Sequence, residues 1–214
     1  MTGTQPRPGF NHNDFYHRYL LRHVPPRCDR ALDVGCGTGL FVRRLAPYAR
    51  WVEGIDRAPE MIAIARGLSA GIPNACYVEA DLLDVDLGSR RYDYIACIAS
   101  IHHLPFAEAV TCLHAALAPG GVLAILGCYR QTTPTDYLSS LVAAPMNLAR
   151  NAAVRKKARL STSGLPAAPP VMDPQMTLRE IKQAAQRLLP AAVIRRHLYW
   201  RYSLLYRRPS IRPQ

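Results

Sequence analysis

The chain has 214 residues and a mass of 23.8 kDa, which is the size of one domain. Hydrophobic residues make up 49% of the sequence and charged residues 20%, so wholesale disorder is excluded. The formal net charge is +12, but residues 1–149 carry equal numbers of basic and acidic residues, and the whole excess lies in residues 150–214. The basic character therefore belongs to one part of the surface and not to the fold.

Membrane-spanning, secreted and zinc-binding classes are not indicated. No apolar run reaches the roughly 18–20 residues that a spanning helix needs, and the first ten residues lack the apolar stretch of a signal peptide, so we expect none. The six cysteines lack the spacing of a zinc site, so we expect reduced thiols and no metal. Together these features predict a cytoplasmic protein.

Residues 1–10 look like a flexible tail, and residues 11–29 are expected to hold a leading helix, centred on Asn13–His23. From residue 30 onward, strand-like and helix-like segments alternate. The predicted strands are Arg30–Val34, Trp51–Ile55, Ala75–Val78, Tyr92–Ala99 and Gly121–Cys128, and the predicted helices are Leu40–Tyr48, Pro59–Leu68 and Phe106–Leu117. This alternation predicts a parallel sheet with helices on both faces.

Segment 130–176 interrupts the alternation with six prolines and a basic cluster at Arg150–Arg159. Long excursions in compact domains are usually functional lids or disordered, and the apolar stretch Leu138–Ala149 argues against simple disorder. We therefore predict an inserted helical lid that encloses a mostly apolar pocket. The same apolar and basic segment would also fit weak contact with an anionic membrane surface.

The C-terminal segment 177–214 completes the fold. Residues 177–180 form a capping box that opens a helix, and Ala191–Tyr199 and Arg201–Arg208 are expected to form an antiparallel strand pair at the sheet edge. The predicted fold class is therefore α/β, with a doubly wound, Rossmann-like, mostly parallel seven-stranded sheet.

Three glycines, at positions 35, 37 and 39, follow the first predicted strand. A dinucleotide fingerprint would place its third glycine three residues after the second, so a pyrophosphate cradle is not favoured. Glycines after a buried strand nevertheless let the backbone pass close to a ligand at the carboxyl end of a sheet.

The segment Leu32-Asp33-Val34-Gly35-Cys36-Gly37-Thr38-Gly39 resembles motif I of the class I S-adenosylmethionine-dependent methyltransferases, and it matches that pattern in full. Asp56 stands where the family binds both ribose hydroxyls, and a carboxylate is a natural double acceptor for a diol. Asp81 stands where the family places an Asp against the adenine amino group. Segments 91–95 and 117–121 resemble the family's entries into the fourth and fifth strands, so the resemblance covers residues 30–128.

The resemblance implies one methyltransferase domain over residues 11–214, with its cofactor-binding core in residues 30–129. It implies S-adenosylmethionine as methyl donor, S-adenosylhomocysteine as product, and no metal. The implied cofactor-binding residues are Asp33, Gly35, Cys36, Gly37, Gly39, Asp56, Arg57, Met61, Asp81, Leu82 and Ala99. For Arg57 and Met61, a plain surface or core role is an equal alternative.

His102 and His103 follow the fourth strand, where the family faces the sulfonium and the acceptor. A histidine there can remove a proton from a hydroxyl or amine during methyl transfer. Alternatively, the pair only shapes the pocket, and in-line placement supplies most of the rate. The candidate lid and substrate residues are His12 and Tyr16 in the leading helix and Tyr129 after the fifth strand.

Aromatic residues and arginines interleave over residues 195–208, which is a pattern that RNA-binding proteins use, but an edge strand pair gives the same pattern without a partner. We therefore expect methyl transfer to an O or N atom of a small organic molecule, for instance in secondary metabolism, and no nucleic-acid partner. Two alternatives stay open. One is an RNA or protein methyltransferase that uses the basic C-terminal third, and the other is a methyltransferase-like fold that binds the cofactor and catalyses another reaction.

Overall fold

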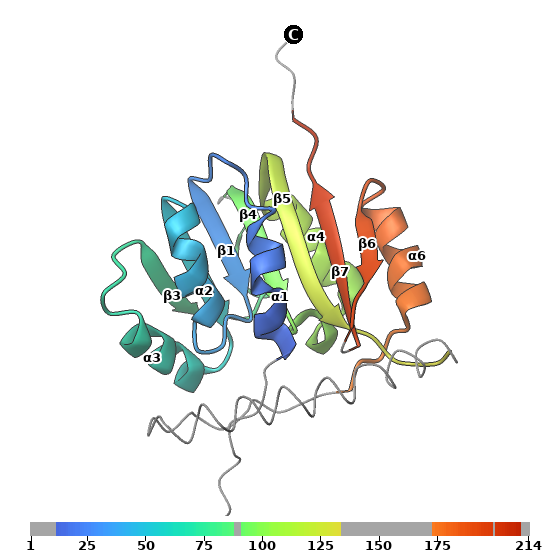
Figure 1. Ribbon diagram of the computed structural model, residues 1–214, viewed down its shortest axis with the longest axis horizontal. Helices are drawn as coiled ribbons and strands as arrows, with labels where there is room; N and C mark the ends of the chain where they lie inside the picture. The colour runs from blue at the N-terminus through green and yellow to red at the C-terminus, as the bar shows by residue number, and fades with distance from the viewer. Residues whose placement is uncertain (1–11, 88–90, 134–172, 199, 211–214) are drawn as a thin grey trace, which may run out of the picture.

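The computed structural model describes residues 12–87, 91–133, 173–198 and 200–210 (Figure 1). Within these residues, seven strands form one sheet in the order β3-β2-β1-β4-β5-β7-β6. The parallel strands are β1 (Arg30–Val34), β2 (Trp51–Asp56), β3 (Ala75–Glu79), β4 (Tyr92–Ile98) and β5 (Leu117–Cys128). At one edge, β7 (Arg201–Arg207) runs antiparallel to β5, and β6 (Val193–Arg196) runs antiparallel to β7. The predicted doubly wound sheet with its antiparallel edge pair is confirmed.

Helices cover both faces of the sheet and enclose two apolar clusters (Figure 1). One face packs against α1 (His12–Leu21), α2 (Leu40–Leu45) and α3 (Pro59–Leu68). The other face packs against α4 (Phe106–Ala116) and α6 (Leu178–Leu188). Strands β1, β4 and β5 are almost wholly buried because both of their faces are covered, which explains their continuous apolar sequences.

Several helices and strands begin or end at residues other than those predicted, for local reasons. The predicted helix Leu40–Tyr48 is α-helical only as far as Leu45 and continues as a 3-10 turn, η1 (Ala46–Tyr48). The change occurs because Pro47 has no N–H to continue the α-helical hydrogen bonds. The fifth strand begins at Leu117 instead of Gly121, with a shift in its pairing to β4 between Tyr92 and Tyr94. Strand β6 ends at Arg196 because the His197 amide donates to the Arg201 carbonyl at 2.8 Å and closes the turn.

The chain leaves β1 toward β2 on one side and returns to β4 on the other, so the strand order reverses between β1 and β4. At such a switch point, the carboxyl ends of adjacent parallel strands open a crevice in which ligands bind. The glycine-rich loop after β1 and the 3-10 turn η2 (Ile101–His103) after β4 lie at this point.

The ends of the predicted insertion are held together. The Arg130 amide donates to the Met176 carbonyl at 2.8 Å, and Arg130 forms an isolated parallel bridge with Thr177. The predicted tail 1–10 and most of the predicted lid, including Leu138–Ala149 and Arg150–Arg159, lie outside the described residues. No helix among the described residues is long and apolar enough to cross a membrane.

Candidate active site

Backbone hydrogen bonds to β2 hold the loop that follows β1. The amides of Gly35 and Cys36 both donate to the Ile55 carbonyl, at 2.8 and 3.0 Å. Gly35, Gly37 and Gly39 have φ values of 70°, 51° and 73°, in the left-handed region that favours glycine. These turns bend the chain sharply from β1 into α2.

The three glycines differ in their surroundings. A Cβ at Gly35 would come within 2.7 Å of Ser100 Oγ and still closer to Ser100 Cβ, and a Cβ at Gly39 would come within 2.7 Å of the Tyr77 ring. Among the described residues, no atom would lie within 4 Å of a Cβ at Gly37. Gly35 and Gly39 are therefore required by packing, whereas Gly37 borders open space over the switch point.

Asp56, the last residue of β2, is fixed beside this loop. Its Oδ2 accepts a 2.8 Å hydrogen bond from the Gly37 amide, and its Oδ1 accepts a 3.0 Å bond from the Ala58 amide. Each carboxylate oxygen has a second lone pair, so the carboxylate can still accept from two hydroxyl donors. The half-buried side chain thus joins the glycine loop to the start of α3 and remains able to bind a diol.

Asp33 lies beneath the loop and is only 2% exposed. Burial, together with the nearby charge of Asp56, raises its pKa to about 8. Its Oδ1 is buried and has no hydrogen-bond partner among the described residues. Such a group favours a donor from a bound ligand, because an unsatisfied buried acceptor costs about 1–3 kcal/mol.

The remaining predicted cofactor residues lie around the same edge in different settings. Arg57 is exposed and Met61 is half-buried, which leaves both of their predicted roles open. Asp81 follows β3, and its Oδ1 accepts from the Leu83 amide at 3.0 Å. Leu82 is buried in the apolar core, and its carbonyl accepts from Cys112 Sγ at 3.5 Å, so a contact of Leu82 with the cofactor stays a prediction.

Two further positions complete the predicted set. The Cys36 side chain is buried against β2, where it approaches Gly54, and burial raises the pKa of its thiol. Ala99, directly after β4, has a φ of 52°, a strained value for a residue with a Cβ, and its amide donates to the Leu126 carbonyl at 2.7 Å. Strained backbone of this kind is concentrated at ligand-binding sites.

His102 and His103 stack at the end of β4 with ring centroids 4.1 Å apart and an interplanar angle of 38°. Burial, together with the charges of His103 and Arg201, lowers the pKa of His102 to about 4. Burial and the charge of Arg57 lower the pKa of His103 as well. His102 Nδ1 is buried and has no partner among the described residues. His102 is therefore neutral at physiological pH and able to accept a proton.

Sequence reasoning gave Ser100 no role of its own. Ser100 Oγ donates to the Val34 carbonyl at 2.7 Å and lies 3.1 Å from Cys97 Sγ. The hydroxyl therefore ties the end of β4 to the end of β1, and its side chain fills the space beside Gly35. A serine two residues before the histidine pair was the only signal in the sequence, and a single hydroxyl of this kind is common outside functional sites.

Tyr77 on β3 was also missed. Its hydroxyl lies 2.6 Å from Ser69 Oγ and 3.5 Å from the Gly39 carbonyl, and its ring occupies the space above Gly39. Tyr77 thereby holds the far end of the glycine loop. Only the three-dimensional packing of β3 against α2 shows this contact, because 38 residues separate Tyr77 from Gly39.

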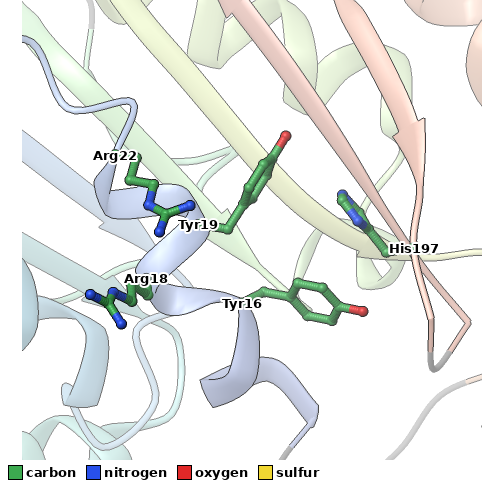
Figure 2. Close-up of a pocket in the computed structure, with 5 residues that line it drawn as sticks. All are labelled: Tyr16, Arg18, Tyr19, Arg22 and His197. Carbon is green, nitrogen blue, oxygen red and sulfur yellow. The ribbon is translucent and has the colours of Figure 1, made fainter.

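Tyr16 and Tyr19 project from α1 toward His197 in the turn between β6 and β7, and Arg18 and Arg22 point away from it (Figure 2). These five residues line a shallow hollow of about 240 Å³. The Tyr16 hydroxyl donates to the Leu198 carbonyl at 3.0 Å, so Tyr16 fastens α1 to the turn. The side chain of His12 lies outside the described residues, and cofactor or substrate contact by His12 or Tyr16 stays a prediction.

Tyr129, directly after β5, is 2% exposed and belongs to the apolar cluster under α6. The Arg196 guanidinium lies over its ring, 5.9 Å from the centroid. Tyr129 therefore forms part of the wall beneath the edge, and its contact with a substrate stays a prediction. Among the described residues, no three His, Cys, Asp or Glu side chains gather closely enough to hold a metal ion.

The methyltransferase-domain family matches this chain over residues 31–121, which span the glycine loop, Asp56, Asp81 and the histidine pair. The chain is 31% identical over 203 residues to an uncharacterised methyltransferase of Mycobacterium tuberculosis, Rv0089. This match covers 94% of this chain and 98% of that protein. It is 40% identical over 111 residues to the ubiquinone biosynthesis O-methyltransferase of Xylella fastidiosa, a match that covers 49% of this chain and 44% of the relative.

The fold is shared with a solved methyltransferase of the same architecture. The N-methyltransferase NodS from Bradyrhizobium japonicum, solved with S-adenosyl-L-homocysteine, superposes with a TM-score of 0.60 at 16% identity, covering 92% of this chain and 87% of that one. The near full-length relationship to Rv0089, the matched domain and the shared fold agree with one another. The chain belongs to the class I S-adenosylmethionine-dependent methyltransferases.

Proposed function

We propose that this enzyme transfers the methyl group of S-adenosylmethionine to an O or N atom of a small organic acceptor at the carboxyl edge of the sheet. The observation that carries the proposal is the pairing of Asp56 with the Gly37 amide, beside the open space over Gly37. A diol acceptor and a Cβ-free backbone thus border the same crevice. The name of the ubiquinone biosynthesis relative supports a small-molecule acceptor.

The residues present fit the cofactor at three points. Asp56 can accept from both ribose hydroxyls, and the exposed backbone at Gly37 lets the ligand approach closely. The unpartnered Oδ1 of Asp33 offers a buried acceptor to an ammonium or a bridging water beneath the loop. The position of Asp81 directly after β3, the next strand beyond β2, supports a contact with the adenine base.

When bound, S-adenosylmethionine supplies an electrophilic methyl group on a positively charged sulfur. The chain's own task is to hold the acceptor in line with that carbon and to keep water from competing. His102, neutral and partly buried at the end of β4, can take the proton that the acceptor releases. With a pKa of about 4 it is a weak base, so positioning supplies most of the rate enhancement.

Calorimetry with S-adenosylhomocysteine tests the proposal. In Asp56→Ala, hydrogen bonds to a charged acceptor disappear, so affinity should fall by about 1.5–3 kcal/mol, or roughly 10- to 150-fold. Asp93→Ala is the matched control, because Asp93 also accepts from two backbone amides, those of Asp29 and Arg30, but lies at the amino edge of the sheet. It should bind the ligand as the wild type does. Equal losses in both variants, or no loss in Asp56→Ala, would refute the cofactor assignment.

A further inference from the structure

Three segments meet beside the site on the side away from β2 and β3. The turn η2 follows β4, Tyr129 and Arg130 follow β5, and Arg201 begins β7. The Ala99 amide bonds to the Leu126 carbonyl, and Arg201 pairs in register with Cys128, so the ends of β4 and β5 and the start of β7 are adjacent. An acceptor bound beside His102 would therefore border these three segments.

The two halves of the edge carry opposite charges. The acidic residues Asp56, Glu79 and Asp81 follow or end β2 and β3. No acidic residue occurs in the sequence from 98 to 104, from 128 to 133 or from 196 to 201, where the charged residues are Arg130, Arg196 and Arg201. The half at β2 and β3 is thus acidic on balance, with these three carboxylates against Arg57, and the three segments of the other half carry only basic charges.

Two of these arginines are partly buried at the edge. The half-buried Arg196 places its guanidinium carbon over the Tyr129 ring, 5.9 Å from the ring centroid, which is a cation–π arrangement. Arg201 is half-buried beside Cys128, and its charge is close enough to disfavour protonation of His102. A planar guanidinium held in place suits bidentate binding of a carboxylate or phosphate.

We infer that the methyl acceptor carries an anionic group, a carboxylate or a phosphate, which Arg201 and Arg196 bind while the nucleophilic atom faces His102. This inference rests on the proposed function, because it assigns a substrate class to the same site. Arg201 and Arg196 are specificity residues in this account. They select and orient the acceptor and take no part in breaking or forming bonds.

Tryptophan fluorescence provides a direct binding test without knowledge of the true acceptor. Trp200 adjoins Arg201, and the other tryptophan of the chain, Trp51, begins β2 at the opposite edge of the sheet, displaced sideways by four strand spacings or roughly 19 Å. A Trp51→Phe background therefore leaves Trp200 as the reporter. Benzoate, phenyl phosphate and the neutral isostere benzamide are titrated into this protein saturated with S-adenosylhomocysteine.

We expect benzoate or phenyl phosphate to bind at least tenfold more tightly than benzamide, and the stronger of the two identifies the group. Arg201→Gln should abolish this preference, and Arg196→Gln should reduce it. Arg187→Gln is the matched control, since it removes an exposed arginine from the last turn of α6, and it should retain the preference.

Equal affinity for the three probes, or a preference that survives in both Arg201→Gln and Arg196→Gln, would overturn the inference. The affinity of each variant for S-adenosylhomocysteine is measured alongside and reports intact folding. If Arg201→Gln alone loses affinity for S-adenosylhomocysteine, the anion preference of Arg196→Gln decides the test. A wild type that fails to bind S-adenosylhomocysteine contradicts the proposed function itself, whereas normal binding without anion preference contradicts only the acceptor class.

Discussion

Gly35 and Gly37 share a positive φ but face different neighbours. Ser100 fills the space beside Gly35, whereas no atom of the part of the chain that the structure describes lies near the missing Cβ of Gly37. The first glycine therefore serves packing between β1 and β4, and the second leaves room for a ligand. This difference separates the effect of an added methyl group on stability from its effect on binding.

Alanine substitution at these two glycines should separate the two roles. In Gly37→Ala, the left-handed backbone costs about 1–2 kcal/mol of stability, and S-adenosylhomocysteine affinity falls at least about tenfold because the methyl group enters the ligand's space. In Gly35→Ala, the clash with Ser100 adds about 1–3 kcal/mol to that strain. Urea unfolding and calorimetry measure both quantities. A Gly37→Ala protein with unchanged ligand affinity would contradict the assignment of that space.

The buried carboxyl group of Asp33 should cause the free energy of unfolding to fall as the pH rises. Its pKa is about 8 in the folded protein and near 3.8 when unfolded, so between these values the folded state binds more protons. The contribution of Asp33 is therefore full below about pH 4 and is lost as the pH rises through 8. Urea unfolding at pH 5, 7 and 8.5 should show this fall in the wild type and a flatter profile in Asp33→Asn. Parallel profiles would mean that the carboxyl is ionised in the folded state.

Individual site residues were predictable from sequence to different degrees. Spacing along the chain placed Gly35 and Asp56 correctly at the sheet edge, because each follows a buried strand and parallel strands end at the same edge. The contacts of Ser100 and Tyr77 could not be predicted. They depend on which strands become neighbours, and no local pattern encodes a hydroxyl that bonds across 66 residues, as Ser100 does to Val34.

Helices and strands followed the sequence most closely where burial decides the pattern. The predicted bounds of β1 and α3 agree with the structure, and Thr177 and Glu180 form the capping box that starts α6. Boundaries were wrong where a backbone bond ends an element early, as at the turn after Arg196. Apolar periodicity continues through such turns and gives no sign of them.

The segment between Arg130 and Thr177 offers a test of the predicted lid. The bridge between these two residues brings the ends of the segment together, so a short linker can replace Pro134–Pro170 without straining the sheet. We expect the deletion variant to bind S-adenosylhomocysteine nearly as the wild type does and to lose methyl transfer. Calorimetry and a turnover assay on the true acceptor give the two readouts. Full turnover would contradict the lid, and loss of cofactor binding would place the segment in the core of the fold.

Charge is distributed over the whole molecule in a way that composition alone could not show. The excess of +12 lies in residues 150–214, and its share at the described sheet edge is Arg196 and Arg201. The acidic residues Asp56 and Asp81 lie across the switch point. A cationic methyl donor and an anionic acceptor would therefore each meet opposite charge. The sequence pattern suggested nucleic acid as an alternative use of these arginines, because it does not reveal that they border the same crevice.

A crystal structure of the full chain with S-adenosylhomocysteine would show where the cofactor binds. We expect the ribose hydroxyls within hydrogen-bond distance of Asp56, the backbone of Gly37 against the ligand, and the sulfur facing His102. A ligand bound elsewhere, or one whose ribose lies away from Asp56 with no contact to the loop after β1, would contradict this expectation.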